Sequence, residues 1–524
     1  MPPIEITALD RFFAESLLGS KEESETFFAL SKLMAASRQG HLCVSEKRLF
    51  DSASVLDPFP LSIVGKGLEF FPKTPIVQYQ GCYYLQRNWV YETHLVQETK
   101  RIRAYPPPSW LDLEKFKKEL PLQPLLPAQR QAIEQVSQCP LSIFCGGPGS
   151  GKTYTASYLI ALLSSALKRE KKSSLQILLT APTGKAASHL HATIQKLNIS
   201  ECIESATLHR LLQLTPGQEK LFAHRFLDAD VVLVDEASMI DVSLMAHLLE
   251  SIGEETLVVL IGDPHQLPPI ESGSIFPEMA GLFGSYLDQC MRTEKKELQS
   301  LATAVKTQDL QTLSQCYRDI WIPLPDKEEL YKWIQPFFSE EMPDPEIAAK
   351  MYSRRRILCP IRKGKDGIDA LNTFFFERIS ASKAYWAIPI LATSNDSWTG
   401  IYNGMNGILI GRGRDVLAAY FPTPKDGGKM DLISPIPPYE IAFCLSIHKS
   451  QGSEYDEVLA FFPQGSESFG KEGLYTAITR ARKKLLLSGS EKTLMQMVQT
   501  PIKTESNFTK RYTDAVCVHS SEPL

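Results

Sequence analysis

The sequence predicts an α/β protein with two parallel-sheet domains, a small N-terminal α+β domain and a small inserted β-barrel. Two stretches of the chain alternate short apolar runs with helical patterns, which is typical of parallel strands buried on both faces. The chain has 524 residues, too many for one hydrophobic core. A glycine-rich phosphate-binding pattern follows one of the apolar runs and precedes a helical pattern.

The composition is that of an ordinary globular protein. Apolar residues make up 43% and charged residues 22% of the chain, and no apolar run is long enough to span a bilayer. The first residues lack a secretory signal pattern, and the 10 Cys are scattered without a C-x-x-C pair. We therefore expect a cytoplasmic protein with reduced thiols and no structural metal. The net charge of −4 gives no bulk signal for nucleic acid, so such binding requires a local channel or partners.

The first part of the chain, residues 1–110, predicts a domain of its own. Apolar residues from Phe27 to Met34 follow helical spacing, and residues 76–84 mix β-branched and aromatic side chains as strands do. Three prolines at 106–108 then predict an extended linker, because proline fits neither a helix interior nor a central strand. We place the domain boundary near residue 110.

The first α/β domain is predicted over residues 111–290, and the second over residues 291–384 and 441–524. Residues 385–440 repeat Gly and Pro among short β-like stretches, which predicts the inserted barrel. The apolar runs that we expect to be strands lie at 141–145, 175–180, 231–235 and 257–263 in the first domain and at 356–359, 457–462 and 484–488 in the second.

Eight consecutive residues fit the pattern G-x-x-x-x-G-K-[ST] of a P-loop. In this pattern the glycines let backbone N–H groups turn toward a phosphate chain, the lysine adds a positive charge, and the last hydroxyl can hold Mg²⁺. A glycine-rich turn is the competing interpretation, and the position between a strand and a helix argues against it. We therefore expect ATP and Mg²⁺ to bind at Gly146, Gly147, Pro148, Gly149, Ser150, Gly151, Lys152 and Thr153.

Two carboxylates, Asp235 and Glu236, follow the apolar run that ends at Val234. We expect Asp235 to hold the metal together with Thr153, and Glu236 to accept a proton from the attacking water. An Asp-Glu pair is usually a solvated surface pair. Here four apolar residues come directly before it, downstream of a P-loop, and this favours a site at a strand end.

Two glutamines are further candidates. Gln266 follows the next apolar run, where its amide can bond the γ-phosphate or its water, and Gln129 lies before the P-loop, where an amide can read an adenine edge. Two arginines outside the first predicted sheet, Arg292 and Arg480, can reach the γ-phosphate from a second domain and couple closure to hydrolysis. Taken alone, each of the four would be read as an ordinary surface residue.

Together these segments resemble the 5′→3′ branch of superfamily 1 helicases over about residues 120–490. Leu179–Ala187 resembles the first DNA-contact motif of that branch, Thr207–Leu212 the second, and Ile447–Asp456 the motif that touches both strand and nucleotide. The resemblance implies two RecA-like P-loop NTPase domains and an SH3-like β-barrel insertion. It also implies DNA contacts by Thr183, Lys185, Thr207, His209, Asn403, His448 and Lys449.

Within that branch the chain resembles the RecD family, the α subunits of exodeoxyribonuclease V (the RecBCD complex). Ile357–Gly364, Tyr402-Asn403-Gly404 and, less specifically, Gly81–Glu92 carry this resemblance. Met405-Asn406 departs from it, since the family usually has an acidic and an aliphatic residue there. The resemblance implies a heterotrimer with RecB-like and RecC-like subunits in double-strand break repair and recombination, a single-stranded end of double-stranded DNA as substrate, and an N-terminal domain docked on the RecC-like subunit.

Other interpretations stay open. The chain can be a helicase of the same branch that acts alone, or a nucleotide-binding scaffold that does not hydrolyse ATP. Clustered carboxylates with a lysine, as a nuclease needs, are not visible beyond the residues already assigned, so nuclease activity is expected from another subunit. A short hairpin turning at Pro216-Gly217 is a candidate pin for strand separation, and only a small one.

Overall fold

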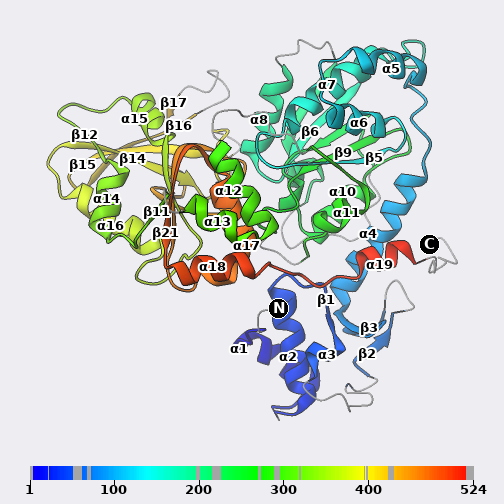
Figure 1. Ribbon diagram of the computed structural model, residues 1–524, viewed down its shortest axis with the longest axis horizontal. Coiled ribbons are helices and arrows are strands. Elements are labelled where there is room, and N and C mark those ends of the chain that lie inside the picture. Colours follow the sequence, from blue (N-terminus) through cyan, green and yellow to red (C-terminus); the bar gives the residue numbers. More distant parts are fainter. Residues whose placement is uncertain are drawn as a thin grey trace.

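The structure is a computed structural model, and three bodies can be distinguished in it: an N-terminal domain and two α/β domains, the second with an all-β insertion (Figure 1). Among the described residues, no helix is both long and apolar enough to cross a membrane. The structure describes residues 4–21, 23–50, 59, 62–67, 72–195, 201–214, 226–269, 273–287, 296–317, 320–394, 396, 399–422 and 430–514.

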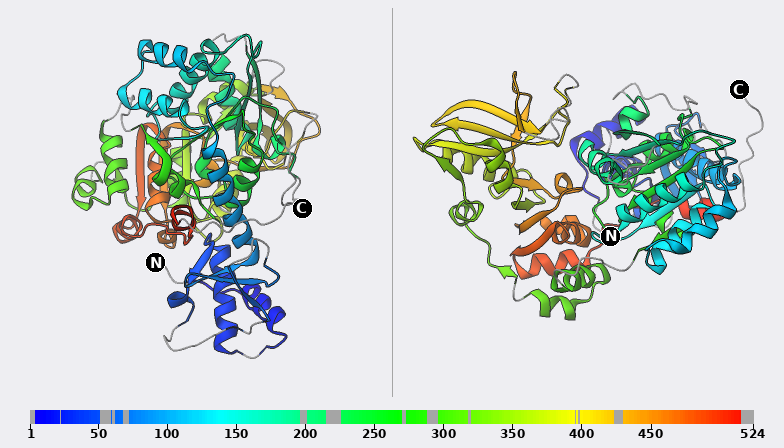
Figure 2. Two further views of the ribbon diagram at one scale, coloured as in Figure 1. Left: turned by 90° about the vertical axis from the view of Figure 1, so that its right-hand side faces the viewer. Right: turned by 90° about the horizontal axis from the view of Figure 1, so that it is seen from above.

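The N-terminal domain combines helices with a four-stranded sheet of order β1-β4-β3-β2. The predicted strand at 76–84 is a hairpin, because Gln80 and Gly81 have φ angles of 48° and 73°, as two-residue hairpin turns require. Figure 2 shows this domain projecting to one side of the other bodies. Its helices are α1 (Ala8–Leu18), α2 (Glu25–Arg38), α3 (Glu46–Leu49) and α4 (Gln86–Ala104), and its strands are β1 (Cys43–Ser45), β2 (Val64–Lys66), β3 (Ile76–Tyr79) and β4 (Cys82–Leu85).

The first α/β domain has a parallel sheet of order β10-β5-β9-β8-β6-β7. The four predicted strands are confirmed, and every residue of β5, β8 and β9 is buried. The sequence did not predict β7, whose residues are polar and partly exposed. The strands are β5 (Leu141–Cys145), β6 (Gln176–Ala181), β7 (Cys202–Thr207), β8 (Val231–Val234), β9 (Leu257–Gly262) and β10 (Gly284–Tyr286). The helices are α5 (Leu113–Glu119), α6 (Pro127–Val136), α7 (Lys152–Ser165), α8 (Gly184–Gln195), α9 (Leu208–Leu211), α10 (Val242–Glu250) and α11 (Phe276–Phe283).

The second α/β domain has a parallel sheet of order β11-β21-β20-β13-β19, so the prediction of two parallel-sheet domains is confirmed. Its strands are β11 (Trp321–Ile322), β13 (Arg355–Cys359), β19 (Cys444–Ser446), β20 (Tyr455–Phe462) and β21 (Ala481–Gly489). Its helices are α12 (Lys296–Thr307), α13 (Leu310–Tyr317), α14 (Lys327–Ile334), α15 (Pro345–Tyr352), α16 (Ile368–Ser380), α17 (Gly470–Ile478) and α18 (Glu491–Gln499).

An antiparallel sheet lies where the sequence predicts an inserted β unit. It pairs in the order β12-β14-β15-β16-β17, with β18 on β14, and β12 comes from outside the expected limits 385–440. The SH3-like form of this unit stays a prediction. Its strands are β12 (Phe337–Ser339), β14 (Tyr385–Ala392), β15 (Asn406–Arg412), β16 (Asp415–Pro422), β17 (Met430–Leu432) and β18 (Tyr439–Ile441).

Residues 500–514, which we call the C-terminal strap, contain α19 (Phe508–Thr513). The strap leaves the second α/β domain, where the Glu472 carboxylate accepts a hydrogen bond from Ile502 N at 2.8 Å. It then passes to the N-terminal domain, where Leu42 N donates to Glu505 O at 2.9 Å, and ends beside α4 (Figure 1). The sequence assigns these residues to the second α/β domain, whereas α19 contacts α4 and α11.

Candidate active site between the two α/β domains

Three neighbouring strands of the first sheet bring the nucleotide candidates together. The P-loop follows β5, Asp235 follows β8, and Asp263 and Gln266 follow β9, which lies between the other two. Because these strands are parallel, their carboxyl ends share one edge of the sheet. Residues that are far apart in sequence therefore meet at that edge, which is the usual place for ligands in open α/β sheets.

The P-loop has the backbone that its glycines permit. Gly149 and Gly151 have φ angles of 78° and 82°, which residues with a Cβ rarely adopt, and α7 begins at Lys152. The Lys152 ammonium donates to Gly146 O at 2.6 Å and to Gly147 O at 3.1 Å. The cation thus bonds the carbonyls of its own loop, and a phosphate chain would offer it stronger, charged acceptors.

Two carboxylates lie at the end of β8, where Asp235 is buried and Glu236 is half-buried. Asp235 is 8% exposed, and its Oδ1 accepts a hydrogen bond from Glu236 N at 2.8 Å. Burial raises the pKa of Asp235 and, together with the charge of Asp235, the pKa of Glu236. Glu236 has a φ of 52° in the left-handed region, which costs a non-glycine residue free energy and is frequent at functional sites. A carboxylate with a raised pKa is a better proton acceptor near neutral pH.

Several buried polar atoms at this edge lack a hydrogen-bond partner within the part of the chain that the structure describes. Native proteins satisfy most such atoms, so a group of them indicates a ligand. Gln129, which is 2% exposed, accepts a bond from Leu126 N at 3.1 Å and leaves its amide nitrogen unpaired. The unpaired atoms are Gln129 Nε2, Ser150 Oγ, Thr180 Oγ1, Ser238 Oγ and Gln266 Oε1.

The donor set fits a nucleotide with its metal. Oxygen ligands suit Mg²⁺, and Thr153 and Asp235 offer a hydroxyl and a carboxylate at this edge. Thr153 is half-buried in the first turn of α7. These two residues would hold the ion beside the phosphates that the P-loop cradles.

Arg480 approaches the same edge from the second α/β domain. It is 3% exposed, and its guanidinium donates to Ser453 O at 3.3 Å and to Thr476 O at 3.2 Å. Its positive charge and that of Lys152 both act to lower the pKa of Glu236, against burial. Lys152 and Arg480 therefore face one carboxylate from two domains. The other candidate arginine, Arg292, lies outside the described residues.

Further hydrogen bonds cross between the two α/β domains. The Tyr475 hydroxyl donates to Asp263 Oδ2 at 2.9 Å, and Leu267 N donates to Thr476 Oγ1 at 2.9 Å. Gln451 Nε2 donates to Leu267 O at 3.0 Å. Sequence reasoning missed Tyr475 and Asp263 as site residues. The available signal was their place in the same segments as Arg480 and Gln266.

The candidate DNA contacts of the first α/β domain follow β6 and β7, next to the nucleotide strands. Thr183 and Lys185 come after β6, and Thr207 and His209 after β7 at the end of the sheet. Lys185 and His209 are exposed. The nucleotide candidates and these polar and basic residues thus occupy one continuous edge of the sheet.

The remaining DNA candidates face this edge from the second α/β domain and its insertion. Lys185 Nζ donates to Ser453 Oγ at 2.7 Å across the interface. Exposed Asn403 lies in the turn before β15, next to Tyr402, whose Cβ would be 3.3 Å from a Cβ at Gly184. Lys185, Arg356, Asn406 and Tyr455 line part of a cavity of about 540 Å³ where the three parts meet.

His448 and Lys449 follow β19. Burial lowers the pKa of His448, which favours a neutral imidazole, and the exposed Lys449 donates to Glu440 Oε1 at 2.5 Å. Lys449 therefore bonds a carboxylate of β18, and a phosphate would have to compete with that partner. The predicted hairpin at Pro216-Gly217 lies outside the described residues.

Comparisons with known proteins agree with this geometry. Residues 129–272 match the AAA domain family, and residues 441–488 match the UvrD-like helicase C-terminal domain family. The RecBCD enzyme subunit RecD of Mycolicibacterium smegmatis is 28% identical over 539 residues, which cover 95% of this chain and 95% of that protein. The ATP-dependent RecD2 DNA helicase of Deinococcus radiodurans is 28% identical over 69% of this chain and 48% of that protein.

Solved structures show a weaker likeness. A Pif1 helicase from Bacteroides in complex with ADP-AlF3 and ssDNA aligns with a TM-score of 0.44 at 17% identity, over 72% of this chain and 94% of that chain. The sequence relatives are therefore the stronger finding, because one of them extends over nearly the full length of both proteins.

Proposed function

We propose that this chain, a RecD-type superfamily 1 helicase by sequence, is an ATP-driven motor that moves 5′→3′ along single-stranded DNA. The observation that carries this proposal is the shared edge of the first sheet. ATP-binding candidates follow β5, β9 and β8, strand-binding candidates follow β6 and β7, and the second α/β domain bonds to both groups. A change at the nucleotide can thus alter the grip on a strand.

The hydrolysis step follows from the residues at this edge. The P-loop amides and Lys152 bind the phosphates, while Glu236 takes the proton of the attacking water. The unpaired Gln266 Oε1 can accept a hydrogen bond from that water. Arg480 reaches the developing charge from the second domain. Mg²⁺ held by Thr153 and Asp235 would neutralise charge on the phosphates.

Translocation requires contacts that ignore base sequence. Thr183, Lys185, Thr207 and His209 offer hydroxyl, ammonium and imidazole groups, which suit phosphates and sugars more than base edges. The hydrogen bond between Lys185 and Ser453 links these four residues to the second α/β domain. Ser453 lies two residues after Gln451, which also bonds across the domain interface. Asn403, His448 and Lys449 are proposed to hold the strand from the other side.

We also propose a role within a RecBCD-type complex in the cytoplasm, in recombination and double-strand break repair. Support comes from the near full-length similarity to a RecBCD enzyme subunit. RecB-like and RecC-like subunits would then be the partners, with residues 1–110 docking on the RecC-like one. Leu9 and Phe12 on α1 are 58% and 66% exposed, and such apolar side chains suit a protein interface.

A stand-alone helicase is the second candidate. It is favoured by the similarity to the RecD2 helicase, which extends over 69% of this chain and 48% of that longer protein. A scaffold without hydrolysis fits less well, because it would have no use for a half-buried base, Glu236, with a raised pKa. The complex subunit and the stand-alone helicase would differ in their partners and would hydrolyse ATP in the same way.

A polarity assay on tailed duplexes tests the motor directly. The purified chain, alone and with co-purified partners, receives duplexes with a 5′ or a 3′ single-stranded tail, and ATPase activity is measured with and without single-stranded DNA. We expect DNA to stimulate ATPase and only the 5′-tailed duplex to be unwound. Unwinding of only the 3′-tailed duplex would refute the 5′→3′ polarity. If no partner co-purifies with the chain, the stand-alone helicase is favoured.

The affinity for single strands should fall with salt. Each phosphate that is contacted releases counterions, so log K should fall against log salt with a slope of about −0.7 per contact. Fluorescence anisotropy of a labelled oligonucleotide at several salt concentrations measures this slope. A flat response would contradict a channel that tracks the backbone.

A further inference from the structure

The side chain of Tyr154 connects the P-loop with the segment that carries Gln129. Tyr154 directly follows Thr153, in the first turn of α7, and is 41% exposed. Its hydroxyl donates to Pro124 O at 3.5 Å, in the segment that leads into α6 and Gln129. The ring therefore extends from the end of the phosphate-binding loop toward the candidate that reads an adenine edge.

The Tyr154 ring is held in this position from two sides. The Tyr158 ring, one helical turn further along α7, packs against it with centroids 4.7 Å apart and an interplanar angle of 52°. Tyr158 is itself packed against the core of the first α/β domain. On the other side, the Arg130 guanidinium donates to Gln123 O and Leu125 O at 3.4 Å each, which supports the segment around Pro124. A ring that is already held loses little conformational entropy when it binds a ligand.

Gln129 offers a polar group that complements the ring. Leu126 N donates to Gln129 Oε1 at 3.1 Å, which orients the amide and leaves its Nε2 as a donor without a partner among the described residues. A purine has acceptor nitrogens along its edge and a π surface on each face. The amide suits the edge of such a base, and the tyrosine ring suits its face.

We propose that Tyr154 binds the base of the nucleotide by stacking and so favours a nucleotide over free phosphates. The inference rests on the proposed function, because ATP is the ligand. A nucleotide whose phosphates lie in the P-loop has its base one ribose away from them. Tyr154 directly follows that loop, and its ring extends toward Gln129. A single exposed tyrosine is ordinary on a protein surface, but this one lies between two parts of one candidate site.

Stacking and edge contacts divide the recognition of the base between two residues. Every base has a π face, so the contribution of Tyr154 should be similar for ADP and GDP, whereas Gln129 contacts the edge, where bases differ. Loss of the ring from a stacked base should weaken binding by about 10-fold. The phosphates are bound by other residues, so their contribution should not change.

Two variants of Tyr154 provide the test. Tyr154→Ala removes the ring, and Tyr154→Phe keeps the ring without the hydroxyl. Isothermal titration of the whole chain with MgADP and with magnesium pyrophosphate separates the base from the phosphates and requires no turnover. We expect Tyr154→Ala to bind MgADP about 10-fold more weakly and pyrophosphate as well as the wild type does, which also shows that its P-loop is folded. Tyr154→Phe should bind both ligands like the wild type.

The matched control is Tyr439→Ala, which removes a tyrosine of similar exposure, 36%, from β18. It should bind both ligands like the wild type. A fluorescent purine analogue gives a second readout, because its emission is quenched when its ring stacks. The diphosphate of this analogue should be quenched by the wild type and by Tyr154→Phe, and less by Tyr154→Ala.

Three results would contradict the inference. MgADP binding by Tyr154→Ala that equals the wild type would overturn it. An equal loss of MgADP and pyrophosphate binding would also overturn it, because the ring would then support the P-loop and not the base. A wild type that binds neither ligand would refute the proposed function itself.

Discussion

The interface between the two α/β domains and the junction around the C-terminal strap are built from different contacts. At the domain interface, single hydrogen bonds such as that of Tyr475 to Asp263 join polar groups, and Gln266 Oε1 stays unpaired. At the strap junction, a buried ion pair, a stacked cation and a fully buried aromatic ring join three parts of the chain. The first set suits an interface that re-forms in each cycle, and the second suits one that stays closed.

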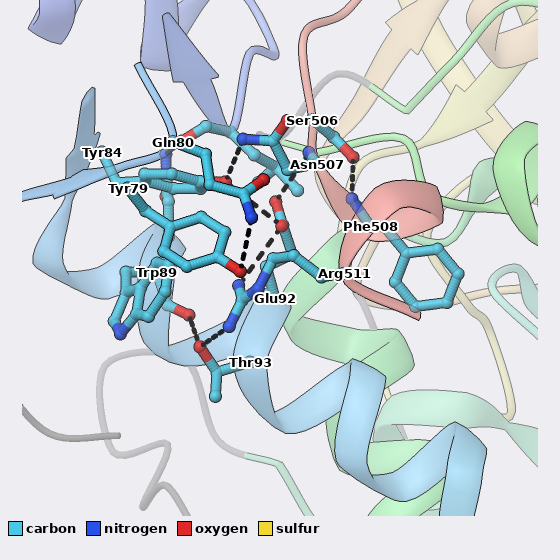
Figure 3. A network of polar contacts seen from close by, with 12 residues as sticks. Tyr79, Gln80, Tyr84, Trp89, Glu92, Thr93, Ser506, Asn507, Phe508 and Arg511 are labelled. Carbon is cyan, nitrogen blue, oxygen red and sulfur yellow. Dashed lines mark hydrogen bonds and ion pairs between the residues drawn. The ribbon is translucent and has the colours of Figure 1, made fainter. Parts of the chain in front are cut away.

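Figure 3 shows the centre of the strap junction. Arg511 pairs with Glu92 at 3.3 Å and donates to Thr93 Oγ1 at 2.6 Å, and its guanidinium lies 3.9 Å from the centre of the Trp89 ring. The two charged side chains are 7% and 0% exposed. Phe508, also of the strap, is fully buried in the core of the first α/β domain.

Substitutions in the two regions should therefore have different effects. Substitutions at the domain interface should remove activity and leave the folded state intact, because the groups there are proposed to serve a ligand. Substitutions at the strap junction should lower stability and leave the chemistry of the folded protein intact, because those groups serve each other.

The largest effect is expected for Lys152→Gln. Steady-state ATPase should fall by at least about 100-fold, since a positioned charge at the phosphates is lost. The thermal midpoint should not change, because the hydrogen bonds of Lys152 within the described part of the chain go to carbonyls of its own loop, and an amide can still donate to them. Lys168→Gln, whose ammonium bonds Ser109 O, is the matched control. Normal ATPase activity of Lys152→Gln would contradict the proposal that Lys152 binds the phosphates.

Arg511→Ala should be the most damaging single change at the strap junction. At pH 8, where Glu92 is ionised in the wild type, it leaves this carboxylate buried without its cation, which typically costs about 3 to 5 kcal/mol. Chemical denaturation measures the loss, and ATPase per folded molecule should stay near wild type. Arg11→Ala breaks an exposed pair with Glu23 and should cost less than about 1 kcal/mol.

A double variant sharpens this prediction. Replacing the pair by neutral groups, Glu92→Gln with Arg511→Met, removes the uncompensated charge and should recover most of the lost stability. If Arg511→Ala lowers the free energy of unfolding no more than Arg11→Ala does, the buried ion pair does not stabilise the strap junction.

The pH dependence of stability should also come from the strap junction. Burial raises the pKa of Glu92 to about 7 from an ordinary 4.5, although Arg511 acts in the opposite direction. Between these values the folded protein holds a proton that the unfolded chain has lost. The unfolding free energy therefore falls as pH rises through this window, by up to about 3 kcal/mol.

Glu92→Gln isolates that contribution. Urea denaturation at pH 5 and pH 8 gives the decrease in unfolding free energy for each protein. This decrease should be smaller in the variant than in the wild type. Asp235 and Glu236 have raised pKa values and add a change of the same sign, but they remain in both proteins and cancel in the difference. Equal losses in the two proteins would contradict the assignment.

The nucleotide candidates could be predicted because each follows a local pattern. Asp235 and Glu236 come directly after an unbroken apolar run, and the P-loop lies between a strand and a helix. Parallel strands then bring such ends to one edge. Strand β7 was missed for the converse reason, since its polar, partly exposed residues do not resemble a buried strand.

Contacts between distant segments could not be predicted in the same way. Tyr475 and Asp263 are 212 residues apart, and Arg48 and Glu505 are 457 apart. Nothing in the local spacing of either member points to the other, because each contact depends on how whole domains are placed. The path of the strap is of this kind. The role of Arg292 in hydrolysis, which the sequence suggests, stays a prediction.

The smallest expected effect is that of Asn507→Ala, at the edge of the same junction. Its amide donates to the Tyr84 hydroxyl at 2.8 Å, and loss of one partly buried neutral hydrogen bond costs about 1 kcal/mol. Asp514→Ala removes a more exposed bond from Gln80, 3.3 Å long, and should cost less. Chemical denaturation of both variants gives the two values. An Asn507→Ala loss as large as that of Arg511→Ala would mean that the junction depends on its whole network and not on the buried ion pair.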